Sequence, residues 1–180
     1  MGAPDDIEAK VASDIAQHGW HVVKVMGDDD APGWAYTIGL HERSAHPELS
    51  VFGMELEQMH HVLNHVAALV RTGRRFEPGE HEGVFEGLRC AIQPVESRWV
   101  PVFFGNAGWH YKSGDFPILQ LFWPDAGGRF PWNPGFAASW RERQPLLFRP
   151  EVASALHPRL AETLRREGAL ELDPQTETPS

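Results

Sequence analysis

The sequence has one cysteine, no stripe of basic residues and no long apolar run. Cys90 cannot form an intrachain disulfide, and it lacks the paired spacing of a zinc knuckle or a CxxC redox motif. No apolar stretch approaches the roughly 18 residues that cross a membrane. The N-terminal segment carries acids where a secretory signal carries positive charge. These absences predict a cytoplasmic protein without membrane contact.

Positive charge is scarce along the whole chain. The 16 Lys and Arg are outnumbered by 25 Asp and Glu, so the net charge is -9 at pH 7. Such a chain repels phosphate backbones, and we expect no nucleic acid partner. The fingerprints GxSxG, GxxxxGK and GxGxxG are also absent, which leaves hydrolase, nucleoside triphosphatase and Rossmann dehydrogenase functions without sequence support. The sequence leaves open whether the chain is an enzyme.

The residues that are present have the composition of a globular protein. Hydrophobic residues make up 42% of the 180 positions and aromatics 11%, enough for one domain with a real core. Four-residue apolar spacing predicts helices, and β-branched runs bounded by turn residues predict strands. The expected helices cover residues 5–17 and 55–73, and the expected strands cover 20–26, 34–40, 49–54, 84–95 and 116–123. Residues 96–115 fit neither pattern.

This order of elements predicts an α+β fold with a mainly antiparallel, barrel-like sheet and flanking helices. We expect residues 1–148 to form a single domain, with Gln144 to Phe148 as its last packed segment. Residues 149–180 should add a short C-terminal helix beginning near Pro158 and a flexible tail of low hydrophobicity.

An aromatic stretch at residues 116–136 has two interpretations. In the first, Pro124 ends a strand, Asp125 accepts backbone amides of the following turn, and the aromatic rings pack inside. In the second, Trp123, Trp132 and Trp109 form an apolar wall with Asp125 as its polar anchor, as in a small-molecule pocket.

Ten histidines are a second feature, since imidazole binds metals and acts as a base near neutral pH. The loop around His41 and His46, and the helix face of His61 and His65, have spacings that could chelate a metal, but neither contains HExxH or further identifiable ligands. We therefore assign no metal site. His110 and Tyr111 form a candidate acid/base pair, although a satisfied, partly buried His and Tyr is the preferred account, because proximity in sequence gives no geometry.

Several motifs, read in order, resemble a bacterial family catalogued as domain of unknown function 4262. The motifs lie within residues 5–148 and read GWHVV, AYTIGL, HPELSVFGM, LQLFWPDAGGRFPW and QPLL. The resemblance implies one cytosolic bacterial domain, and the family name implies no activity.

The layout from residue 21 to Glu55 is similar to that of flavin reductase-like split barrels. This resemblance implies a flavin phosphate facing the loop after Thr37, with flavin mononucleotide (FMN) as the candidate cofactor and a homodimer as the assembly. The contacts would be Thr37, His41, Arg43 and Ser44. The sequence departs from that pattern at Glu42, which would repel a phosphate.

We therefore expect a small-ligand-binding domain, with flavin dependence as one form of it. The expected ligand-binding residues are Thr37, His41, Arg43, Ser44, Trp109, His110, Trp123 and Asp125. The alternative is a non-catalytic interaction module, an adaptor or immunity-like protein, with Trp132, Phe136 and Trp140 as its contact patch. A third hypothesis is metal-dependent hydrolysis through the histidine loop.

Overall fold

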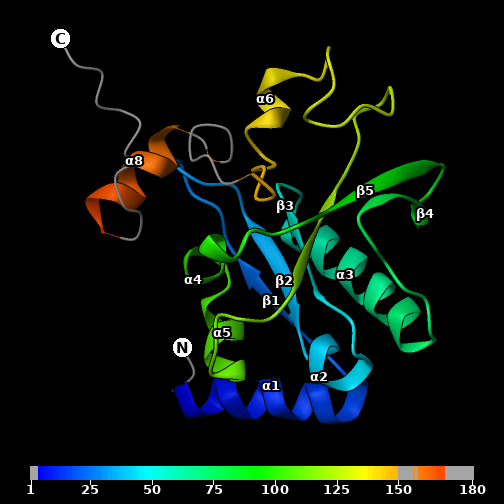
Figure 1. The fold of residues 1–180 in the computed structure, drawn as a ribbon, viewed down its shortest axis with the longest axis vertical. Coiled ribbons are helices and arrows are strands. Elements are labelled where there is room, and N and C mark those ends of the chain that lie inside the picture. Colours follow the sequence, from blue (N-terminus) through cyan, green and yellow to red (C-terminus); the bar gives the residue numbers. More distant parts are fainter. Residues whose placement is uncertain (1–3, 150–155, 157, 169–180) are drawn as a thin grey trace.

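The fold is α+β and is built on one six-stranded mixed sheet (Figure 1). It is seen in a computed structural model that describes residues 4–149, 156 and 158–168. The strands are β1 (His21–Val25), β2 (Trp34–Ile38), β3 (Glu48–Phe52), β4 (Gly79–Phe85), β5 (Leu88–Pro94) and β6 (Ile118–Phe122). Their order across the sheet is β1-β2-β3-β6-β5-β4. Two three-stranded antiparallel units, β1 to β3 and β4 to β6, therefore lie side by side.

The expected barrel is wrong, because the sheet is open. β1 and β4 are its two edges and do not pair with each other. The two units meet through β3 and β6, which are parallel, whereas the other neighbouring strands are antiparallel. Because β3 and β6 join the two units in the middle of the sheet, the outer strands β1 and β4 lie at opposite edges, with four strands between them.

Helices cover both faces of the sheet (Figure 1). They are α1 (Pro4–His18), α2 (Leu40–Ser44), α3 (Leu56–Arg71), the 3-10 turn η1 (Ser97–Trp99), α4 (Val100–Phe103), α5 (Gly105–Tyr111), α6 (Ala138–Arg141) and α8 (Pro158–Arg166). α3 packs its buried residues, among them Leu63 and Val66, on one face. α1, α4, α5 and α8 contribute to a second cluster on the other face.

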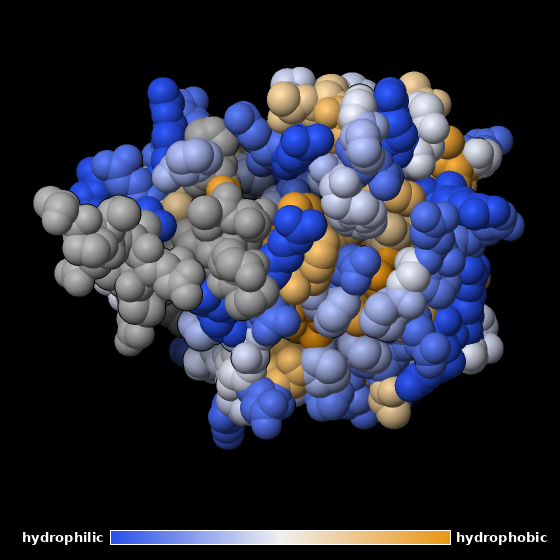
Figure 2. Space-filling view, turned by 45° about the horizontal axis from the view of Figure 1, so that its top comes forward, coloured by the Kyte–Doolittle hydropathy of each residue, from blue (hydrophilic) through white to orange (hydrophobic). Residues whose placement is uncertain are grey.

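Alternation along the strands produces the two core clusters. In β3, Leu49 and Val51 face α3, whereas Phe52 belongs to the other cluster; in β2, Ala35 and Tyr36 divide in the same way. Successive side chains of a strand point to opposite faces, so a sheet covered on both faces is apolar on both. On the side shown in Figure 2, apolar residues reach the surface in scattered patches among hydrophilic ones.

The structure confirms both expected helices and departs from the sequence prediction in two segments. Residues 84–95, expected as one strand, contain the end of β4, a turn and β5, because Gly87 turns the chain with φ 70°. Residues 96–115, which fitted neither pattern, contain η1, α4 and α5. Helices this short are held by packing, here of Trp99, Phe103 and Phe104.

The C-terminal helix is present, and it packs on the core. Leu156, Leu160 and Ala161 are buried in the same cluster as α1 and α5. The expected flexible tail from residue 169 onward lies outside the described residues.

Candidate functional site

A buried carboxylate organises the end of the sheet where β2 finishes and β3 begins. Glu48 is fully buried, and its Oε2 accepts a hydrogen bond from the Thr37 hydroxyl at 2.6 Å. Its Oε1 accepts from the backbone N–H groups of Gly39 and His41, at 2.8 and 3.1 Å. The phenol of Tyr111 also donates to Oε1. All four partners donate, so the carboxylate is internally satisfied.

Gly39 provides the sharp turn that brings these donors together. Its φ is 117°, and a Cβ at this position would lie 2.9 Å from both the Gly19 carbonyl oxygen and Cγ1 of Ile15. Only glycine adopts this conformation without strain. The turn begins α2 directly after β2, so that the N–H groups of Gly39 and His41 both point at Glu48.

Burial governs the protonation of this network. It raises the pKa of Glu48, and the donated hydrogen bonds oppose that shift. Burial, together with the negative charge of Glu48, also raises the pKa of Tyr111. The Tyr111 oxygen accepts the Gly39 N–H at 3.0 Å, so the protonated phenol links α5 to the turn.

This network does not fit a flavin phosphate. The hydroxyl of Thr37 is donated to Glu48 and also accepts the N–H of Leu49 at 2.9 Å. The N–H groups of Gly39 and His41 are donated to the same carboxylate. The donors expected to hold a phosphate are therefore engaged by an internal anion, which would repel a second one.

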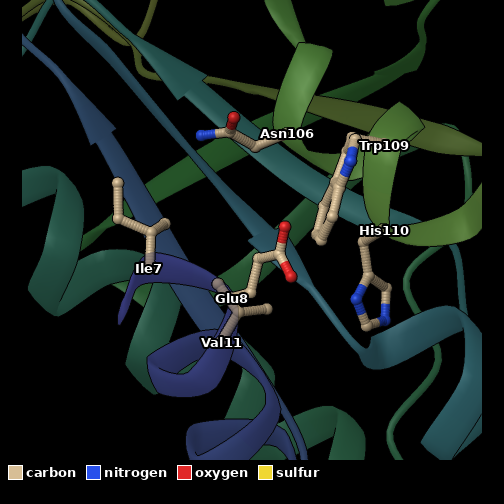
Figure 3. A pocket seen from close by; sticks show the side chains of 6 residues that line it. All are labelled: Ile7, Glu8, Val11, Asn106, Trp109 and His110. Carbon is tan, nitrogen blue, oxygen red and sulfur yellow. The ribbon is translucent and has the colours of Figure 1, made fainter. Parts of the chain in front are cut away.

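An open cleft lies beside this network, between α1 and α5 (Figure 3). Its volume is about 230 Å³. The lining side chains are Ile7, Glu8 and Val11 from α1, and Asn106, Trp109 and His110 from α5. In Figure 3 the carboxylate of Glu8 lies between the two helices, and the indole of Trp109 extends along the α5 side.

His110 connects the cleft with the buried network. Its Nε2 is 2.7 Å from Oε1 of Glu42 in α2, and its ring packs edge-on against Tyr111, with centroids 4.9 Å apart. His41 also packs edge-on against Tyr111. α5 therefore presents His110 to the cleft and Tyr111 to Glu48, and one short helix serves both features.

Only half of the eight expected ligand-binding residues lie in the Glu48 network or in the cleft. Thr37 and His41 lie around Glu48, and Trp109 and His110 line the cleft next to it. Arg43 is exposed on α2, and the Ser44 carbonyl accepts a hydrogen bond from Arg75. Trp123 and Asp125 follow the far end of β6, whereas Glu48 pairs with Ile118 at its beginning. One pocket does not contain all of them.

Asp125 has the contacts that the turn interpretation predicts. Its carboxylate accepts the N–H groups of Gly127 and Arg129, each at 2.9 Å, and the Nε of Arg129 at 2.8 Å. These bonds, above all the one from the Arg129 backbone, lower the pKa of Asp125 even though burial opposes the shift. Trp123 donates its indole N–H to the Phe52 carbonyl at 2.8 Å.

The aromatic residues near this turn are mostly packed inside. Trp132 stacks on Phe130 and meets Phe122 edge-on, and Phe136 is buried. Trp140 is the more exposed member and packs against Trp123. Of the expected contact patch, Trp140 alone is strongly exposed.

One histidine of each grouping is bound to the backbone. His46 has Nδ1 2.7 Å from the Pro47 carbonyl oxygen, and its Nε2 accepts the Phe76 N–H at 3.0 Å. Nε2 of His65 lies 2.9 Å from the Gly83 carbonyl oxygen. Within the part of the chain that the structure describes, no three His, Cys, Asp or Glu side chains are placed to hold a metal ion.

Comparison with known proteins gives one match. A family model described as Domain of unknown function (DUF4262) matches residues 14–137, more than half of the chain. The chain belongs to this family. No curated protein matches it, and no solved structure does. The DUF4262 match contains every strand and the whole Glu48 network, but it begins after Ile7, Glu8 and Val11.

Some functional candidates were missed in the sequence. Glu48 was noticed only as part of a histidine-rich loop, since its partner Tyr111 is 63 residues away. Ile7 and Glu8 carry no motif, although Ile7 belonged to the apolar repeat of the first helix.

Among the described helices, none is both long and apolar enough to span a membrane.

Proposed function

We propose that this DUF4262 protein binds a small organic cation with an apolar or aromatic body in the cleft between α1 and α5. The observation that carries the proposal is the pairing of exposed apolar side chains with a carboxylate in one concave place. Small-molecule sites commonly combine apolar walls with a few polar groups.

Two large apolar side chains remain exposed at this cleft. Ile7 is 53% exposed and Trp109 is 57% exposed. The helices that carry them, α1 and α5, bury other apolar residues such as Val11 and Ala107. A ligand that covers both would remove apolar area from water, which is favourable in proportion to that area. The face of an indole also attracts cations.

Charge in and around the cleft favours a cation. Glu8 lines the cleft, and Glu42 is bound to His110 at its rim. The chain as a whole carries a net charge of -9, so long-range electrostatics also attract a cation and repel an anion.

The volume limits the size of the ligand. About 230 Å³ is below the roughly 300–1,000 Å³ of sites that enclose drug-sized molecules. A single-ring amine suits this space better than the three-ring flavin of FMN. The proposed site includes two residues that the sequence analysis named as ligand-binding, Trp109 and His110. It adds Glu8, which the sequence analysis did not name.

A titration with 2-phenylethylamine, compared with phenylacetate, tests the proposal. We expect the indole N–H resonance of Trp109, assigned by its loss in Trp109→Leu, to shift saturably with the amine. Phenylacetate, which has the same ring and the opposite charge, should bind at least roughly tenfold more weakly, a difference of about 1.4 kcal/mol. Glu8→Gln should weaken amine binding about fivefold, as loss of one partly exposed charge contact does.

The matched control is Glu86→Gln, which removes an exposed carboxylate from the turn between β4 and β5. It should leave binding of the amine unchanged. Equal binding of the amine and phenylacetate, or unchanged binding in Glu8→Gln, would refute the cation site. A visible absorbance spectrum of purified protein that shows bound flavin would also contradict it. Recovery of a protein partner that is lost in Trp140→Ala would instead support the interaction module.

A further inference from the structure

We infer that the ligand of the cleft is an ammonium ion that carries at least one N–H, and that Nδ1 of His110 accepts this N–H. The inference rests on the cation site proposed above and names the class of cation: a protonated primary, secondary or tertiary amine, and not a quaternary ammonium ion. The features that carry it are the hydrogen-bond partner of His110 and the position of its second ring nitrogen in the cleft.

Glu42 determines which nitrogen of His110 carries the hydrogen. Nε2 lies 2.7 Å from Oε1 of Glu42. A carboxylate has only acceptor oxygens, so Nε2 is the donor of this bond. In the neutral ring, Nδ1 then has a lone pair and accepts hydrogen bonds. No described residue is hydrogen-bonded to Nδ1, which leaves this acceptor for a ligand.

The ring of His110 is held with this acceptor toward the cleft. Glu42 of α2 holds the Nε2 side, and Tyr111 packs edge-on against the ring, with centroids 4.9 Å apart. In Figure 3, Nδ1 lies on the side of the ring that faces Glu8 and Val11 of α1. The His110 side chain is 22% exposed, so it is largely enclosed and still open to the cleft. An acceptor already held in place loses little conformational freedom when it binds.

The other walls of the cleft do not suit a quaternary ammonium ion. Quaternary ammonium ligands are recognised by cages of aromatic rings. Trp109 is the sole Trp, Tyr or Phe among the described lining residues. Glu8 attracts any cation through its charge, methylated or not, whereas Nδ1 of His110 contributes only where an N–H is donated to it. Selectivity for an N–H therefore depends on His110.

Calorimetric titration with 2-phenylethylamines methylated at nitrogen tests the inference. The N,N-dimethyl amine keeps one N–H, and the N,N,N-trimethyl ion has none, although the two differ by a single methyl group. At about pH 8, where histidine is ordinarily neutral, the dimethyl amine should bind at least roughly tenfold more tightly, because the trimethyl ion loses a hydrogen bond from a charged donor. The step from the monomethyl to the dimethyl amine adds a methyl group and keeps an N–H, so it should change affinity by up to about fourfold.

His110→Phe keeps an aromatic ring against Tyr111 and removes the acceptor. In this variant the affinities for the dimethyl and trimethyl compounds should lie within about fourfold of each other. The matched control is His61→Phe, at an exposed position of α3 outside the cleft, which should keep the tenfold difference. Equal binding of the two compounds by the unmodified protein, or an undiminished difference in folded His110→Phe, would overturn the inference and leave the cation site standing. Failure of every amine to bind would remove both.

A second measurement covers the case in which His110→Phe does not fold. Nitrogen-15 spectra of the histidine rings in the unmodified protein report which ring nitrogen carries the hydrogen. The Nδ1 signal of His110 should be that of an unprotonated nitrogen, should move toward the protonated position as the dimethyl amine is added, and should stay in place with the trimethyl ion. The signals of His81, whose Nε2 lies 2.7 Å from the Glu77 carbonyl oxygen, should not respond to either. A hydrogen on Nδ1 of His110 in the ligand-free protein at this pH would overturn the inference.

Discussion

At the scale of single residues, His46 is held in one protonation state by backbone groups. Its Nε2 accepts the N–H of Phe76 and its Nδ1 is bound to the Pro47 carbonyl, so the ring must be neutral with the hydrogen on Nδ1. Burial, the largest cause, lowers the pKa of His46, and the charge of Arg75 adds to the shift. A protonated His46 would lose the bond to Phe76 and leave a buried charge.

This arrangement predicts a pH dependence of stability. The unfolded chain takes up a proton at His46 below about pH 6.5, whereas the folded protein does so only at lower pH. The stability that neutral His46 provides is thus present above about pH 6.5 and is lost as pH falls toward its folded pKa. His46→Gln should flatten the decline of the melting temperature between pH 7 and 5.

The control for this change is His61→Gln, at an exposed position of α3. It should leave the slope of melting temperature against pH like that of the unmodified protein. A slope in His46→Gln that matches the unmodified protein would contradict the assignment of the pH effect to this ring.

At the scale of secondary structure elements, the junction of β2 with α2 depends on Gly39. Its positive φ and the proximity of the Gly19 carbonyl oxygen leave no room for a Cβ. The turn also places two backbone donors on Glu48, so distortion there disturbs the whole carboxylate network.

Gly39→Ala should therefore lower the free energy of unfolding by about 2–4 kcal/mol, through backbone strain and loss of a buried hydrogen bond. Urea unfolding followed by circular dichroism measures the change. Gly105→Ala is the matched control, because Gly105 begins α5 with open space around it. It should be neutral or stabilising by up to about 1 kcal/mol. Similar losses in both variants would refute the special role of Gly39.

Elements with local signals could be predicted from the sequence, and elements without them could not. The apolar repeat of α1 lies entirely within α1, and that of α3 entirely within α3. The sequence therefore predicted both helices. α5 contains Gly105 and Gly108, which disfavour helix locally, and packing overrides that preference. The Glu48 network needs residues from β2, β3 and α5, and no single segment of sequence reveals it.

At the scale of the whole molecule, α8 is part of the core. Leu160 is 8% exposed and Ala161 is 3% exposed, in the cluster that also holds Val11 and Leu147. The sequence prediction placed this helix after residues 144–148, which were expected to be the last packed segment. Its burial depends on contacts with distant residues that composition does not encode.

Leu160→Ala should lower the free energy of unfolding by about 2–4 kcal/mol and keep a single thermal transition, since α8 unfolds together with the sheet. Glu162→Ala, at an exposed position of the same helix, should change stability by no more than about 0.5 kcal/mol. A separate early transition for α8, or an unchanged main transition in Leu160→Ala, would show that residues after 148 are independent of the domain.

The parallel join of β3 with β6 also sets the order in which a nascent chain can fold. β1 to β3 and α3 emerge from the ribosome first, and they can pair and pack among themselves. The open edge of β3 then lacks its neighbour until Ile118–Phe122 has been synthesised. An apolar strand edge that waits for a distant partner folds slowly and is prone to aggregation. Chaperone dependence should therefore concentrate in the interval between synthesis of α3 and synthesis of β6.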